Sequence, residues 1–247
     1  MDEQKSTVRA VERALDILLC FTDATELSLS EIAKQISLHK STVHRLLASL
    51  EGKGFVIRDS HTEKYRLGFR LWELSANLTH SDDPAYILLP EMERLRDTLG
   101  ETISLYIRDG LERVRIQAVQ SNQPIRRVAP IGVRMPLAVG ASSKVLVAYA
   151  DASVQEEILQ DPNWPEAVNK QVYQEQLDEI RRLGYAMSVQ EREIGAAAIA
   201  APIFDRHGKL FAALTASGPS NRMTPEVMKD FAEPLMETAK RMGKMMK

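Results

Sequence analysis

The sequence between residues 28 and 47 reads SLSEIAKQISLHKSTVHRLL. Ser28 is followed three positions later by Glu31, a spacing that predicts a reciprocally capped helix over residues 29–36. Residues 37 and 38 provide a tight turn, and a second helix is expected over about 39–53, with Val43 and Leu47 facing inward. Two helices joined by so short a turn predict a helix-turn-helix, whose second helix enters the major groove of DNA.

The flanking sequence extends this pattern in both directions. Before it, apolar residues recur at three- and four-residue steps between Val8 and Leu19, the spacing of one apolar side of a helix. After it, residues 55–57 and 64–67 read as two short strands joined by the polar run DSHTE. Helix, short helix, turn, helix and hairpin make up the winged form of the helix-turn-helix. We therefore expect a winged helix-turn-helix domain over residues 1–68.

The exposed side of the second helix carries residue types that bind DNA. Hydroxyls and cations contact phosphates, and arginine also grips the edge of guanine. The net charge of the chain is −2, but residues 39–70 hold seven Lys and Arg against three Asp and Glu. The predicted DNA-binding residues are Lys40, Ser41, Thr42, His44 and Arg45 on the helix and Lys64 in the hairpin. From this pattern alone, an adaptor that binds protein through the same fold is an open alternative.

The composition excludes several other classes of protein. The chain has 247 residues, 44% hydrophobic and 27% charged, and no apolar run near the roughly 18 residues that cross a bilayer. Its start does not read as a signal peptide, and its single cysteine, Cys20, allows no internal disulfide. We expect a cytoplasmic protein that contacts no membrane. There is no Gly-rich phosphate loop, no metal-ligand spacing and no Gly-x-Ser-x-Gly elbow, so no catalytic residue, metal or cofactor is expected.

Four motifs of the first part together resemble the IclR family of bacterial transcriptional regulators: VRAVERALDIL from Val8, LSEIA from Leu29, KSTVHRLL from Lys40 and YRLG from Tyr65. The resemblance implies binding to double-stranded operator DNA, a linker helix and hinge over residues 69–83, and a homodimer or homotetramer. The resemblance leaves open whether RNA polymerase is a further partner and whether the protein represses or activates transcription. One departure is Ser37-Leu38-His39, where the family commonly has Gly-Leu followed by Ser or Pro.

The second part, residues 84–247, predicts an antiparallel sheet flanked by helices. Residues 102–108 and 112–119 read as a hairpin across Asp109-Gly110, and further strands are expected over 185–190, 196–205 and 210–217. Helices are expected over 172–183 and after Thr224. In the strand 112–119, Arg113 and Arg115 alternate with Val114 and Ile116, which predicts one covered face and one face exposed to water.

This part resembles the effector-binding domain of the same family, which has a GAF-like or profilin-like fold. The resemblance rests on PIGVRMPL from Pro130, IRRLGYA from Ile180, AAPIFD from Ala200 and SGP from Ser217. It implies an α+β protein that senses a small organic acid, aromatic acids included, and controls a catabolic or metabolic operon. The implied effector-binding positions are Met135, Ala141, Ser142, Ser188, Ala198, Thr215 and Ser217.

The chain departs from the family at three of the surrounding positions. Ser143 stands where a glycine is frequent, and Ser188 and Ala198 stand where some members have Asp and Cys. A helix start at Ala141 suits a carboxylate, because free N–H groups and the helix dipole favour negative charge there. Arg126, Arg127 and Arg134 are either cations for such an acid or ordinary surface residues. From the residues alone, an enzyme with a site in this half is a second open alternative.

Overall fold

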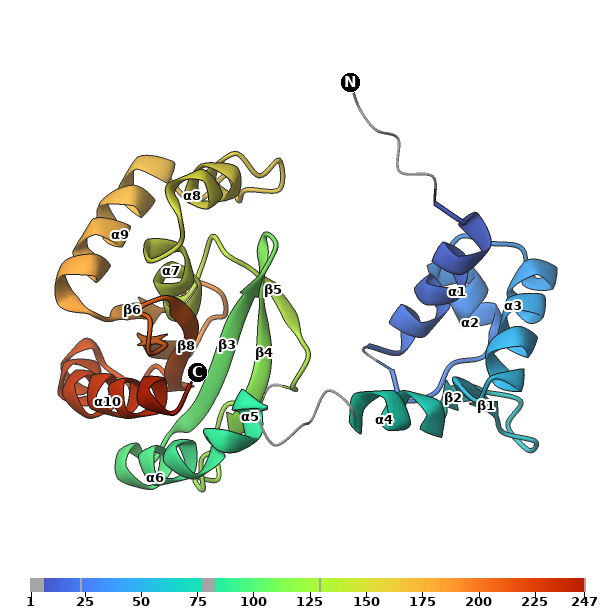
Figure 1. Cartoon of the computed structure of the whole chain (residues 1–247), viewed down its shortest axis with the longest axis horizontal. Coiled ribbons are helices and arrows are strands. Elements are labelled where there is room, and N and C mark those ends of the chain that lie inside the picture. Colours follow the sequence, from blue (N-terminus) through green and yellow to red (C-terminus); the bar gives the residue numbers. More distant parts are fainter. Residues whose placement is uncertain (1–6, 23, 77–82, 129, 247) are drawn as a thin grey trace. The chain divides into compact units, whose positions relative to one another are not determined.

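The chain forms two compact units that divide between residues 80 and 81 (Figure 1). The computed structural model describes residues 7–22, 24–76, 83–128 and 130–246. The first unit combines helices with a two-stranded sheet and the second combines helices with a six-stranded sheet, which confirms the expected α+β class. No described helix is both long and apolar enough to span a membrane.

The first unit has the element order expected of a winged helix-turn-helix. Its elements are α1 (Arg9–Leu19), a 3-10 turn η1 (Cys20–Thr22), α2 (Leu29–Gln35), α3 (Lys40–Gly52), β1 (Val56–Arg58), β2 (Tyr65–Leu67) and α4 (Phe69–Ala76). The two strands pair antiparallel. The rest of the predicted linker segment, residues 77–82, lies outside the described residues.

Local sequence explains how α2 begins. The Ser28 hydroxyl accepts a hydrogen bond from the N–H of Glu31 at 3.3 Å, and the Glu31 carboxylate accepts one from the N–H of Ser28 at 2.7 Å. The predicted capping box is therefore confirmed. Behind it, Ile17, Ile32 and Leu47 are fully buried and bring α1, α2 and α3 together. Burial of each such side chain contributes about 1.5–3 kcal/mol.

The second unit is built on one antiparallel sheet. Its elements are α5 (Pro84–Ile87), α6 (Leu89–Leu99), β3 (Thr102–Asp109), β4 (Glu112–Val119), β5 (Arg134–Pro136), α7 (Ala141–Ala148), α8 (Ala152–Leu159), α9 (Lys170–Leu183), β6 (Ala186–Val189), β7 (Ala196–Phe204), β8 (Leu210–Pro219) and α10 (Pro225–Met245). The strand order is β5-β4-β3-β8-β7-β6, and every neighbouring pair is antiparallel. The expected hairpin of β3 and β4 is present.

The two faces of this sheet differ in character. Leu105, Leu214 and Ile199 belong to one face, whose core includes residues of α6 and α10. The opposite face has a separate core with residues of α7 and α9, including Val145 and Leu177. Side chains alternate between the faces along each strand. This second face also carries the polar residues that form the candidate site.

The structure corrects the prediction for residues 112–119, which form β4. Arg113 is 5% exposed and Arg115 1% exposed, whereas Val114 and Ile116 are only half-buried. The arginine side was expected to face water. It is buried because β4 lies inside the sheet, and because the start of α7 and Met135 cover the arginine side.

Candidate functional site

The polar side of α3 faces away from the core of the first unit. Val43 and Leu47 are fully buried. Of the predicted DNA-binding residues on this helix, Thr42 is half-buried and the others are exposed: Lys40, Ser41, His44 and Arg45. Their spacing places the exposed residues on one side of the first two turns. The helix begins without a side-chain cap, so its first N–H groups add to the positive potential of this end.

The hairpin of β1 and β2 supplies the remaining predicted DNA-binding residue, Lys64, which is exposed. Its turn is held by Asp59, whose carboxylate accepts hydrogen bonds from the N–H groups of His61 at 2.9 Å and Thr62 at 2.8 Å. These bonds hold the pKa of Asp59 below its ordinary value. The turn is therefore ordered by local contacts, and Lys64 projects from a defined strand end.

The predicted DNA-binding cations on this surface form no ion pair among the described residues. In the described part of the first unit, Arg58 pairs with Glu63 and Arg70 with Glu73, and no ion pair involves Lys40, Arg45 or Lys64. An unpaired cation on an exposed face can exchange its counterions for phosphates, which is the main source of affinity for DNA.

The turn between α2 and α3 holds an unusual backbone conformation. Ser37 has a φ of +53°, in the left-handed region that disfavours residues with a Cβ. The next N–H, that of Leu38, donates to the carbonyl of Ala33 at 3.0 Å and closes α2. This is the position where the resembling family commonly has glycine, so the tight turn is retained at a cost in strain.

A cavity of about 50 Å³ lies on the polar face of the sheet in the second unit. Six of the seven predicted effector positions line it: Ala141, Ser142, Ser188, Ala198, Thr215 and Ser217. They come from α7, β6, β7 and β8, segments far apart in the sequence. The seventh, Met135, is buried beside the cavity, with its sulfur 3.8 Å from Nη2 of Arg113.

The start of α7 forms one end of this cavity. Ala141 and Ser142 are buried, and the helix begins at Gly140 without a side-chain cap. The N–H of Gly140 donates to one carboxylate oxygen of Glu191 at 3.0 Å, and the other oxygen lies 2.5 Å from Nζ of Lys144. Lys144 therefore neutralises Glu191. The following N–H groups of the helix start favour an anion by their orientation and dipole.

A row of three hydroxyls lies along β3 and β8, and two of its residues, Thr215 and Ser217, line the cavity. Strand register places Ser104 opposite Thr215, and Ser217 is two residues further along β8 on the same face. The hydroxyls of Ser104, Thr215 and Ser217 are buried, and none has a hydrogen-bond partner among the described residues. A buried polar group without a partner costs about 1–3 kcal/mol. The two groups on residues that line the cavity, those of Thr215 and Ser217, indicate a place for a polar ligand.

Arg113 and Tyr106 line the side of the cavity near β4, and Arg115 contacts Tyr106. Arg113 donates to the hydroxyl of Ser142, and its Nε has no partner among the described residues. Behind it, Arg115 donates to the hydroxyl of Tyr106 from Nε at 2.9 Å and from Nη2. Both guanidinium carbons lie over the Tyr106 ring, 5.1 Å and 5.0 Å from its centre for Arg113 and Arg115. Burial lowers the pKa of Arg113 to about 10.

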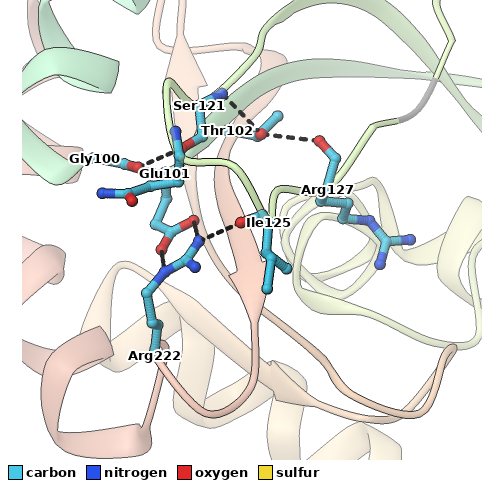
Figure 2. Close-up of polar contacts among 8 residues, drawn as sticks. Gly100, Glu101, Thr102, Ser121, Ile125, Arg127 and Arg222 are labelled. Atoms are coloured by element: carbon cyan, nitrogen blue, oxygen red, sulfur yellow. Dashed lines mark hydrogen bonds and ion pairs between the residues drawn. The ribbon is translucent and has the colours of Figure 1, made fainter.

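The loop over residues 190–195 contributes Glu191, Arg192 and Glu193 to the lining of the cavity. Glu193 pairs with Arg127 at 2.7 Å and lies 3.6 Å from Arg192. Figure 2 shows how the segment that carries Arg127 is held: its carbonyl accepts a hydrogen bond from the Thr102 hydroxyl at 2.9 Å. Thr102 in turn accepts one from the N–H of Ser121 at 3.1 Å. The start of β3 therefore positions one wall of the cavity.

The sequence identified only some of the cations that line the cavity. Arg127 lines the cavity, but Arg126 and Arg134 are exposed, and Arg134 is paired with Asp109 and Glu112. Arg113 and Tyr106 line the cavity and were missed. The available signal was the alternation of arginines along β4. Within the described ranges, no group of three His, Cys, Asp or Glu is close enough to hold a metal.

Comparison with known proteins supports both units. The IclR helix-turn-helix domain matches residues 10–60, and the C-terminal part of the bacterial transcriptional regulator IclR matches residues 77–243. The chain is 30% identical over 251 residues to the transcriptional regulator KdgR of Escherichia coli, a match that covers 100% of this chain and 95% of KdgR.

Solved structures give the same result. An IclR transcriptional regulator from Alicyclobacillus acidocaldarius is 25% identical with a TM-score of 0.83, covering 98% of this chain and 100% of that one. An IclR homologue from Microbacterium hydrocarbonoxydans, complexed with 4-hydroxybenzoate, is 26% identical with a TM-score of 0.78, covering 94% and 99%. This chain belongs to the IclR family of bacterial transcriptional regulators.

Proposed function

We propose that the chain is a ligand-responsive regulator that binds operator DNA through α3 and the β1–β2 hairpin and a small organic acid in the cavity of the second unit. The observation that carries the proposal is that six implied effector positions, separated in sequence, line one cavity with unpartnered polar groups. A catabolic or metabolic operon is the expected target, because a regulator that senses an organic acid suits genes that make or consume it.

For the DNA-binding half, the proposed contacts are divided by chemistry. Lys40, Ser41 and Lys64 contact phosphates, and Arg45 reads a base edge in the major groove from the exposed side of α3. Thr42 and His44, on the same helix, are the remaining proposed DNA contacts. Phosphate contacts position the protein, whereas base contacts give sequence specificity.

For the effector half, the carboxylate of the acid lies at the start of α7, at Ala141 and Ser142. The rest of the ligand lies over Ser188, Ala198, Thr215 and Ser217, and Met135 supports the wall of the site. A relative bound to 4-hydroxybenzoate supports an acid as the ligand class. A helix start with free N–H groups supports the position of its charge.

The working unit is proposed to be a homodimer, or a tetramer built from two dimers. The apolar stripe of α1 is largely uncovered: Val8, Val11, Leu15 and Leu19 are each more than half exposed. Phe69 and Trp72 of α4 are 70% and 73% exposed. Contiguous exposed apolar side chains mark interaction surfaces, and a second copy of the chain would bury them. Two recognition helices would then meet half-sites about one helical turn apart, or a multiple of it.

The effector acts on the operator through the connecting segment, residues 69–83. A ligand changes DNA affinity only if it binds one arrangement of the dimer more tightly than another. RNA polymerase is a further partner where the regulator activates rather than represses.

A footprint on the DNA that flanks the chain's own gene tests the DNA-binding half. At about 50 and 200 mM salt, we expect a protected near-palindrome whose affinity falls steeply with salt, because phosphate contacts release counterions. Protection at neither salt, with or without organic acids present, would overturn the proposal.

A further inference from the structure

The charges around the cavity do not balance. Two carboxylates line it, and both are already engaged by cations: Glu191 by Lys144 at 2.5 Å, and Glu193 by Arg127 at 2.7 Å with Arg192 at 3.6 Å. Arg113 lines the same cavity, is 5% exposed and forms no ion pair among the described residues. A buried charge without a partner is strongly unfavourable. With Arg113, Arg127 and Arg192 lining it and Lys144 bound to Glu191, four cations meet two carboxylates, so the cavity has an excess of positive charge that a carboxylate would reduce.

Tyr106 adds a directed donor beside that charge. Its hydroxyl oxygen accepts two hydrogen bonds from Arg115, and among the described hydrogen bonds it donates none. With the oxygen occupied as an acceptor, the phenolic proton is available for an acceptor in the cavity that the ring lines. Arg115 does not line the cavity and acts through Tyr106, so it is a positioning residue.

The opposite side of the cavity favours oxygen atoms over an aromatic ring. The unpartnered hydroxyls of Thr215 and Ser217 belong to residues that line it, and an apolar ring would leave them unsatisfied.

We propose that the effector is a small aliphatic oxyacid, whose carboxylate binds Arg113 and Tyr106 beside the start of α7 and whose hydroxyl, oxo or second carboxylate group binds the hydroxyls of Thr215 and Ser217. This inference rests on the proposed function of the cavity as an effector site and names the ligand class and the residue that reads its charge. Neither Arg113 nor Tyr106 is among the positions that the family motifs imply.

Calorimetric titration of the full chain tests the ligand class. The probes are glycolate, lactate and malate, each compared with the acid that lacks its hydroxyl: acetate, propionate and succinate. Benzoate and 4-hydroxybenzoate are the aromatic comparison. We expect at least one hydroxy acid to bind about tenfold or more tightly than its partner, because the partner leaves buried hydroxyls unsatisfied. Both aromatic acids are expected to bind more weakly than that hydroxy acid.

Arg113→Met tests the charge reader, with Arg182→Met on the exposed face of α9 as the matched control. We expect Arg113→Met to weaken binding of the best hydroxy acid by about tenfold to a hundredfold, and the control to leave it unchanged. The ligand-free melting temperature of Arg113→Met should not fall, because the change removes a buried unpaired charge. If Arg113→Met does not fold, Arg113→Lys keeps the charge without the planar fork, and its binding should be weaker than that of the wild type.

The outcomes separate this inference from the function on which it rests. Aromatic acids that bind as tightly as the hydroxy acids, or acid affinity that is equal in the wild type and in the Arg113 variant, would overturn the inference and leave the effector cavity in place. Binding of no acid of either kind would overturn the inference and the effector-sensing function together, and the footprint would then decide DNA binding alone.

Discussion

Glu101 and Arg222 lie 121 residues apart in the sequence and form a bidentate ion pair (Figure 2). Nε of Arg222 donates to Oε1 of Glu101 at 2.7 Å and Nη2 donates to Oε2 at 3.0 Å. The Glu101 side chain is 6% exposed and that of Arg222 is 35% exposed. Nη2 of Arg222 also donates to the carbonyl of Ile125 at 2.9 Å. The pair thereby holds the segment that leads to Arg127, one wall of the cavity.

Arg222→Met should destabilise the second unit. It leaves the buried Glu101 carboxylate without its cation, so we expect the free energy of unfolding to fall by about 1–3 kcal/mol. Urea unfolding, compared with Arg182→Met, measures this. Arg182 is exposed and lies 3.6 Å from Glu179, so its loss should change stability by less than about 0.5 kcal/mol. Equal effects of the two variants would contradict the account of this ion pair.

Ser37→Gly should stabilise the first unit. Ser37 adopts a φ of +53°, and a residue with a Cβ pays about 1–2 kcal/mol in that region. Glycine removes this strain but loses more chain entropy on folding, so the expected net gain is about 0.5–1 kcal/mol. Ser49→Gly, in the middle of α3, is the matched control and should lower stability by about the same amount. A loss of stability at position 37 would show that the turn is unstrained.

The capping box of α2 should make the first unit sensitive to acid. Hydrogen bonds from Ser28 lower the pKa of Glu31 from its ordinary value of 4.5. A carboxylate whose pKa is lowered by folding stabilises the fold fully above its unfolded pKa, and the stabilisation is lost as the pH falls through the folded pKa. We therefore expect part of the acid-induced loss of stability below about pH 4.5 to come from Glu31.

Glu31→Gln provides the test, because glutamine can also close a capping box but does not titrate. Thermal unfolding followed by circular dichroism at about pH 7 and pH 3.5 should show a smaller drop in melting temperature for the variant than for the wild type. Identical drops would exclude Glu31 as a source of the acid sensitivity.

Arg45→Ala should weaken specific DNA binding. The side chain is exposed on the polar side of α3 and unpaired in the described structure. If it contacts guanine with two hydrogen bonds, the loss is about 1–3 kcal/mol at the operator. Fluorescence anisotropy with the footprinted site and with random DNA measures it, with Arg182→Ala as a control of equal charge. A loss of the same size on both DNAs would make Arg45 a phosphate contact instead.

The fold of the first unit could be predicted because its signals are local. The hydrogen bonds between Ser28 and Glu31 join residues three apart, and the buried Val43 and Leu47 lie one turn apart on the same side of α3. Such spacings fix which side of a helix is covered before any long-range contact is known. The left-handed Ser37 could be located only as a departure from the family pattern, because its φ depends on the turn it closes.

The cavity could be predicted only in part. Ser142, Thr215 and their neighbours follow from the family motifs, but Arg113 and Arg115 do not. Alternation along a strand tells which residues share a face and not which face is covered. Arg113 is buried by Ser142 and Met135, residues 29 and 22 positions away, and that contact exists only once α7 and β5 are in place. Charged residues on such a strand are normally exposed, so burial here required the structure.

Coupling between the cavity and the operator is the central claim, and one titration tests it most directly. The affinity of the full chain for its footprinted operator is measured by anisotropy without acid and at saturating concentrations of the acid that binds best by calorimetry. We predict a change of about 5- to 150-fold, and the same factor in acid affinity when calorimetry is repeated with operator present, because coupling is reciprocal. An operator affinity that stays constant while the acid saturates the cavity would contradict the account.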